Sequence, residues 1–68
     1  MREVEIRGDM IRLGQLLKVA GIVDSGGEAK ELIADGSVTV NGEPETRRGR
    51  QLHAGDLLVA AGQEVRLV

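Results

Sequence analysis

The stretch that decides the fold runs from Ser25 to Gly42 and reads SGGEAKELIADGSVTVNG. It opens with a capping box, in which Ser25 is followed three residues later by Glu28, and this spacing predicts the start of a helix. Ala29, Leu32 and Ile33 then share one helical face, and the pattern stops at Asp35-Gly36. We therefore predict a short helix behind Ser25.

After Gly36 the apolar period changes from helical to two. Val38 and Val40 alternate with polar residues, which predicts a strand, and Asn41-Gly42 is a strong signal for a type I′ hairpin turn. Pro44 keeps the returning strand short or at a sheet edge. The remaining segments are predicted as a polar loop at 46–51, a turn at Gly55-Asp56, a strand at 57–61, a turn at Gly62-Gln63 and a strand at 64–68.

Upstream of Ser25 the sequence predicts a strand and a second helix. Val4 and Ile6 alternate with charged residues, as in a strand with one wet face. Residues 10–20 follow the helical period, with Asp9 as a plausible N-cap and Gly21 as a left-handed terminator. The predicted fold is α+β: an N-terminal strand, a two-helix hairpin and a small meander of short antiparallel strands. We expect residues 1–68 to form a single domain.

Composition restricts the function. The 68 residues include no cysteine and no Phe, Trp or Tyr, and the formal charge is -2. Disulfides and thiolate zinc sites are excluded, and unpaired bases would find no aromatic side chain to stack on. The N-terminus lacks a signal-peptide core and no apolar run reaches membrane-spanning length, so we expect a soluble, cytoplasmic protein without membrane contact. Any phosphate site needs locally concentrated positive charge.

The first candidate site is the arginine loop, Arg47-Arg48-Gly49-Arg50. Guanidinium groups suit phosphate oxygens, and the glycine lets the backbone approach a ligand closely. The loop could equally be a solvated segment that protects a sheet edge from aggregation. Charge alone does not separate these interpretations.

The second candidate is the helix start at Ser25. Gly26 and Gly27 leave backbone N–H groups accessible at the positive end of a helix dipole, which favours an anion. Spacing alone favours a simpler explanation, in which the glycines permit a tight turn between two helices.

Three further cations could extend a basic strip if the two helices direct them toward the same side: Arg12, Lys18 and Lys30.

Enzymatic interpretations have little support. His53 is the single histidine and has no obvious set of companion ligands for a metal, Asp56 is better explained as part of a turn, and Ser25 as a helix cap. We expect neither catalysis nor a cofactor.

A pattern of residues extends through most of the chain: Ile11-Arg12-Leu13, Leu17, Gly21, Ser25, Ala29, Leu32-Ile33, Gly36, Val38-Thr39-Val40-Asn41-Gly42 and Gly55-Asp56. In this pattern the sequence resembles the S-four-type RNA-binding domain, also called the alpha-L motif. The family usually has Asp where this chain has Gly14, and Arg where it has Gly26. Three segments resemble a subfamily of very small bacterial proteins made of this domain alone: Leu13-Gly14-Gln15, residues 25–30 and residues 45–50.

The resemblance implies RNA binding, with the arginine loop and the Gly-Gly helix start acting together, but it names no RNA. Because the chain has no aromatic side chains, we predict structured RNA, of the rRNA or tRNA class. The predicted contacts are Arg47, Arg48, Arg50, Ser25, Gly26, Gly27, Lys30, Lys18 and Arg12. The alternative is a protein-interaction module of a ribosome-associated or nucleic-acid-processing complex, which the acidic net charge would suit. DNA binding is a third possibility, because phosphate contacts carry no sequence information. The sequence does not define the RNA or the oligomeric state.

Overall fold

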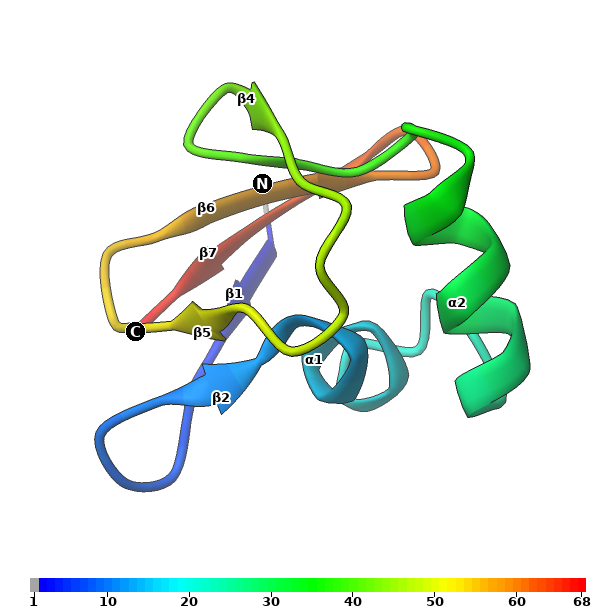
Figure 1. The fold of residues 1–68 in the computed structure, drawn as a ribbon. Helices are drawn as coiled ribbons and strands as arrows, with labels where there is room; N and C mark the ends of the chain where they lie inside the picture. Colours follow the sequence, from blue (N-terminus) through cyan, green and yellow to red (C-terminus); the bar gives the residue numbers. More distant parts are fainter. Residues whose placement is uncertain (1) are drawn as a thin grey trace.

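The computed structural model describes residues 2–68. Its elements follow the order β1 (Arg2–Val4), β2 (Ile11–Arg12), α1 (Leu13–Val19), α2 (Gly26–Ala34), β3 (Thr39–Val40), β4 (Glu43–Pro44), β5 (Gln51–Leu52), β6 (Leu57–Ala60) and β7 (Gln63–Leu67). Five strands form one sheet in the order β1-β7-β6-β3-β4, while β2 and β5 form a separate antiparallel pair. The two helices pack beside the strands, which confirms the predicted α+β class (Figure 1).

The first helix begins later than predicted. The N-cap of α1 is Arg12, which makes no side-chain capping bond, so the assignment of Asp9 as the cap was wrong. Residues 11 and 12 are instead drawn into β2 by pairing with β5, which overrides the helical pattern at Met10–Arg12. The helix end was predicted correctly: Gly21 has φ +73°, and its N–H and that of Ile22 donate to carbonyls of the last turn, as in a Schellman motif.

The second helix was predicted well at both ends. The Glu28 N–H donates to the Ser25 hydroxyl at 3.2 Å, so Ser25 is the N-cap of α2. The helix stops at Ala34, with Asp35 as its C-cap. Ala29 and Ile33 are buried, as their shared face predicted.

The predicted strands are present with small shifts, but β5 was not predicted, and its first residue, Gln51, lies in the segment predicted as a polar loop. Asn41 and Gly42 both have positive φ and join β3 to β4, which lies at the sheet edge. The turn after β6 falls at Ala61-Gly62 rather than Gly62-Gln63, so β6 ends one residue earlier than predicted and β7 is shifted by one residue. The predicted strand at the N-terminus is present as β1, and it runs parallel to β7 instead of extending an antiparallel meander.

One aliphatic core joins the helices to both groups of strands. Its buried members are Leu13, Leu16, Leu17, Val23, Ala29, Ile33, Val38, Val40, Leu52, Leu58, Ala60, Val65 and Leu67. These side chains fix α1 against α2 and against the strands, and thereby position the surface between the helices. Within residues 2–68, no helix has the length and apolar character needed to cross a membrane.

Two substitutions in α1 test this core. Leu17 is fully buried, whereas Val19 is 61% exposed in the same helix. Leu17→Ala is expected to lower the free energy of unfolding by about 2–5 kcal/mol, because it removes buried methyl groups and leaves a cavity. Val19→Ala is the matched control and should change that free energy by no more than about 0.5 kcal/mol. Urea titrations followed by circular dichroism measure both, and equal losses would contradict the assigned packing.

Candidate nucleic-acid interface

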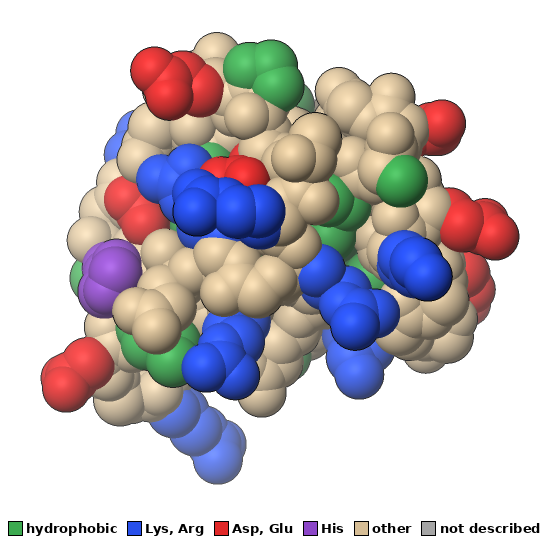
Figure 2. All heavy atoms as spheres, viewed as in Figure 1, with side chains coloured by type: hydrophobic (Ala, Val, Ile, Leu, Met, Phe, Trp, Pro, Cys, Tyr) green, Lys and Arg blue, Asp and Glu red, His purple; other side chains and the backbone are tan. Residues whose placement is uncertain are grey.

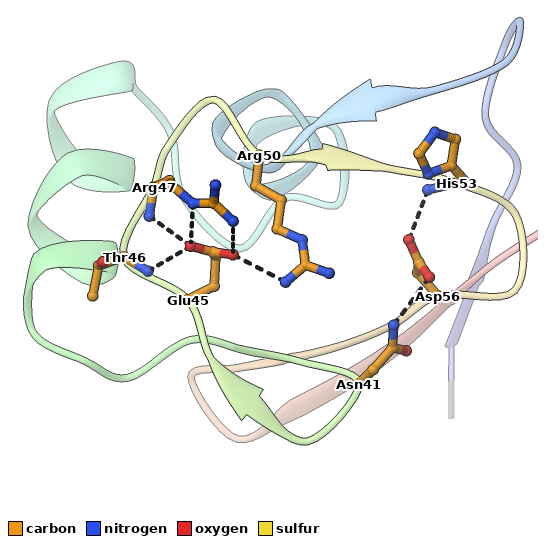
Figure 3. A network of polar contacts seen from close by, with 7 residues as sticks. All are labelled: Asn41, Glu45, Thr46, Arg47, Arg50, His53 and Asp56. Carbon is orange, nitrogen blue, oxygen red and sulfur yellow. Dashed lines mark hydrogen bonds and ion pairs between the residues drawn. The ribbon is translucent and has the colours of Figure 1, made fainter.

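The arginine loop is organised by the acid that precedes it. Glu45 is 6% exposed, and its carboxylate accepts hydrogen bonds from the backbone N–H groups of Thr46 and Arg47. It also accepts bonds from the guanidinium of Arg47 at 3.2 Å and from that of Arg50 at 2.9 Å (Figure 3). Hydrogen bonds from the Arg47 side chain and backbone, followed by the one from Arg50, lower the pKa of Glu45 from 4.5 to about 2.

This ion-pair cluster changes the charge that the loop offers to a ligand. Arg47 and Arg50 share one carboxylate, so part of their charge is neutralised within the loop. The Arg47 side chain is still 75% exposed and that of Arg50 is 29% exposed. Contacts of Arg47 and Arg50 with phosphate remain a prediction. Arg48 is the one arginine of the loop that makes no ion pair with Glu45.

The loop docks on the start of α1. The N–H of Leu13 donates to the carbonyl of Arg50 at 2.9 Å, and the N–H of Gly14 donates to that of Arg48 at 3.0 Å. These two N–H groups lie in the first turn of the helix, where no intrahelical acceptor is available. The loop backbone thus supplies the cap that Asp9 was expected to provide, and the docking places the loop beside both helices.

A hollow of about 770 Å³ lies between α1, the start of α2 and the arginine loop. We call it the basic hollow, and it is lined by Arg12, Gly14, Gln15, Lys18, Gly26, Ala29, Arg48 and Gly49. Its three cations come from β2, α1 and the loop, and no acidic residue is among the described residues that line it. In the space-filling view, Lys and Arg side chains gather around the helices and the loop, and most of the visible acidic side chains lie near the edge of this face of the molecule (Figure 2).

The structure therefore brings together four of the nine predicted contacts, Arg12, Lys18, Gly26 and Arg48. The others lie elsewhere. The Ser25 hydroxyl is used as a helix cap, and Gly27 and Lys30 are exposed but outside the lining of the hollow.

Acidic residues of α2 face a different hollow, of about 260 Å³. Its lining includes Glu28, Glu31 and Asp35 together with apolar residues of the helical hairpin and Ala61. Glu28 thus directs its charge away from the basic hollow, although it belongs to the same helix start as Gly26. Its carboxylate therefore opposes an anion in the basic hollow less than its place in the first turn of α2 would suggest.

Two residues that shape the interface were not identified from the sequence. Glu45 lies two residues before the arginine loop, and an acid so near a cluster of arginines was the available signal for an internal ion pair. In the sequence, Gly14 is notable only as a departure from the family pattern. Its contact with the loop joins residues that are far apart in the chain. No local pattern reports such a contact.

A second polar network ties two turns together on another part of the sheet. The Asn41 side chain donates to Asp56 at 3.0 Å, and the His53 N–H donates to Asp56 at 2.8 Å (Figure 3). The Asn41 side chain also accepts from the Leu57 N–H at 2.9 Å. Burial opposes ionisation of Asp56, but the bonds from Asn41 and His53 outweigh it and lower its pKa. This network is structural. Within residues 2–68, no group of three or more His, Cys, Asp and Glu residues is placed to hold a metal ion.

The family model for the S4 domain matches residues 4–68. The chain belongs to the S4 domain family. It is 46% identical over 59 residues to a Bacillus subtilis protein named "Probable ribosome maturation protein RlbA", covering 87% of this chain and 83% of that one.

Two further comparisons define its place in the family. The solution structure of Escherichia coli YbcJ, described as having an alpha-L motif involved in RNA binding, is 36% identical with a TM-score of 0.77, and it covers all of this chain and 87% of that one. The tyrosine–tRNA ligase of Burkholderia lata is 37% identical over 60 residues, which cover 88% of this chain but 14% of the ligase. Only the S4 part of that enzyme corresponds to this chain.

The Glu45 cluster predicts a specific dependence of stability on pH. Because the pKa of Glu45 is lowered on folding, its contribution to stability is fully present above pH 4.5 and is lost as the pH falls toward 2. Glu45→Gln should therefore be less stable than the wild type at pH 7, and the difference should shrink between pH 5 and pH 2. Urea unfolding across this range measures it.

The matched control is Glu64→Gln, which neutralises an exposed glutamate that makes no ion pair among residues 2–68. A Glu45→Gln deficit that stays constant with pH would show that the carboxylate is not stabilised by its two arginines.

Proposed function

We propose that residues 1–68 form one non-catalytic RNA-binding domain that contacts the phosphates of structured RNA at the basic hollow. The observation that carries this proposal is the convergence of Arg12, Lys18 and Arg48, from three separate segments, beside the start of α2 at Gly26. The chain as a whole has a net charge of -2, so three cations around one hollow are a local concentration of positive charge that would attract an anion.

The chemistry of the hollow suits phosphate. Guanidinium and ammonium groups donate charge-assisted hydrogen bonds to phosphate oxygens, and the free N–H groups at the start of α2 add the positive end of a helix dipole. Arg47, with most of its side chain exposed, and Arg50 would add contacts at the rim while they keep their bonds to Glu45. Ser25, Gly27 and Lys30 complete the proposed surface around the helix start.

The absence of aromatic side chains favours structured RNA. Single-stranded bases are held mainly by stacking on aromatic rings, which this chain cannot provide. Double-helical RNA is recognised by its shape and by contacts to phosphates and 2′-hydroxyls, for which cations and backbone N–H groups are sufficient.

The relatives support RNA of the ribosomal or transfer class. One carries a name for ribosome maturation, another is described by a motif involved in RNA binding, and a third is a tRNA ligase. We favour ribosomal RNA, because one of the relatives that match over most of both chains is named for ribosome maturation, whereas the tRNA ligase matches over only 14% of its length. Binding to ribosomal RNA would place the protein in the cytoplasm.

Salt dependence tests the phosphate contacts. Engagement of about three phosphates gives a slope of log K against log salt of about -2 to -3. Lys18→Ala/Arg48→Ala should reduce the magnitude of that slope by about 1.5, since two contacts are lost. Fluorescence anisotropy with a labelled rRNA hairpin, measured from low to physiological salt, gives both values.

The control variant removes the same charge elsewhere. Arg2 and Arg7 are exposed and lie outside the basic hollow, so Arg2→Ala/Arg7→Ala lowers the net charge by the same amount while leaving the proposed contacts in place. Equal slopes for the two double variants would show that only net charge matters. Competition with duplex DNA at fixed salt distinguishes RNA from DNA.

Crosslinking in the host cell identifies the natural ligand. Recovery of rRNA fragments supports the favoured class and recovery of tRNA the other. A protein partner that stays bound after nuclease treatment, with no RNA recovered, would replace this proposal with a protein-interaction module.

A further inference from the structure

Gly14 lies at the contact between α1 and the arginine loop, within the lining of the basic hollow. It is buried, and its N–H donates to the Arg48 carbonyl at 3.0 Å. A Cβ atom built at Gly14 would lie 2.6 Å from Cγ and 3.2 Å from Cδ of Arg48. The aliphatic part of the Arg48 side chain therefore passes directly over the space that any larger residue would fill.

We infer that Gly14 is the positioning residue that holds the Arg48 side chain in the basic hollow, and that it thereby sets the affinity of this site for phosphate. The inference rests on the proposed function. Gly14 contributes no charge and no side-chain contact to a ligand, so its whole effect is exerted through Arg48.

The geometry shows which group would move on substitution. The nearest backbone atom of the loop to a Cβ at Gly14 is the Arg48 carbonyl oxygen at 3.6 Å, which is an ordinary van der Waals contact. The carbonyl can therefore keep its hydrogen bond from residue 14, while the side-chain carbons of Arg48 must leave. Because Arg48 is exposed, other rotamers directed toward solvent are open to it.

Helix energetics agree with a special role for this glycine. Glycine is disfavoured in a helix relative to alanine, and position 14 lies inside α1 with ordinary helical backbone and no positive φ. Backbone conformation therefore does not require glycine at this position. The close approach of Arg48 is the contact that excludes a side chain.

A double-variant cycle tests the inference with four proteins: wild type, Gly14→Ala, Arg48→Ala and Gly14→Ala/Arg48→Ala. In the Arg48→Ala background Cγ and Cδ are absent, so the same substitution at Gly14 meets no side chain there and serves as the matched control. The probe is a synthetic RNA hairpin, and the readout is the slope of log K against log salt together with thermal unfolding.

Arg48→Ala should lower affinity and reduce the magnitude of the salt slope by about 1, as expected for one lost phosphate contact. Gly14→Ala should reproduce that change while the protein stays folded, and the double variant should bind no more weakly than either single variant. A purely structural role for Gly14 would lower stability without changing the salt slope, and its effect would add to that of Arg48→Ala.

The inference is overturned, with the proposed function intact, if Arg48→Ala weakens binding while Gly14→Ala binds like the wild type or the two losses add. Both fail if Lys18→Ala/Arg48→Ala leaves the affinity and slope of the wild type. If Gly14→Ala does not fold, recovery of folding in the double variant supports the contact with Arg48, and its failure to fold overturns it.

Discussion

The buried carboxylate of Glu45 is the group on which the basic surface depends. A buried charge is costly unless it is paired and hydrogen-bonded, so the loop that follows must keep its N–H groups directed at this carboxylate. That requirement keeps the guanidinium groups of Arg47 and Arg50 hydrogen-bonded to Glu45, although most of the Arg47 side chain stays exposed. The same loop conformation directs two of its carbonyls at the start of α1 and leaves Arg48 to face the hollow.

On this small acidic protein, the basic and acidic side chains near the helices line two different hollows. Arg12, Lys18 and Arg48 surround one hollow, while Glu28 and Glu31 line the other. Screening limits the reach of exposed charges to about 10 Å at moderate salt, so the potential near a ligand depends on local side chains more than on net charge. A chain with a net charge of -2 can therefore present a site for an anion.

Both helices have a glycine in the first turn beside the basic hollow, and each glycine has a different use. A Cβ atom placed on Gly26 would have no neighbouring atom within 4 Å, so this glycine leaves the start of α2 open toward the hollow. Gly14 has the opposite surroundings, since the Arg48 side chain already occupies the space beside it. One glycine leaves room for a ligand, and the other leaves room for the side chain that would contact it.

Features that depend on neighbouring residues could be predicted from the amino-acid sequence. The Ser25 cap, the Gly21 terminator and the Asn41-Gly42 turn were predictable, because capping bonds and positive φ angles are local properties. The α+β class followed from the change in apolar period, and the family pattern added the expectation of RNA binding. The cations of the hollow could also be identified from the sequence, but as separate residues with no evidence that they converge.

The places where those residues meet follow from long-range contacts of the folded chain. The pairing of β2 with β5 removed Asp9 from its predicted role as a cap, and the parallel contact of β1 with β7 joined the two ends of the described chain. The Glu45 cluster and the docking of Gly14 under Arg48 likewise needed the folded chain. These contacts depend on a carboxylate, a carbonyl or a missing side chain meeting a distant partner, and periodicity along the sequence carries no information about such distances.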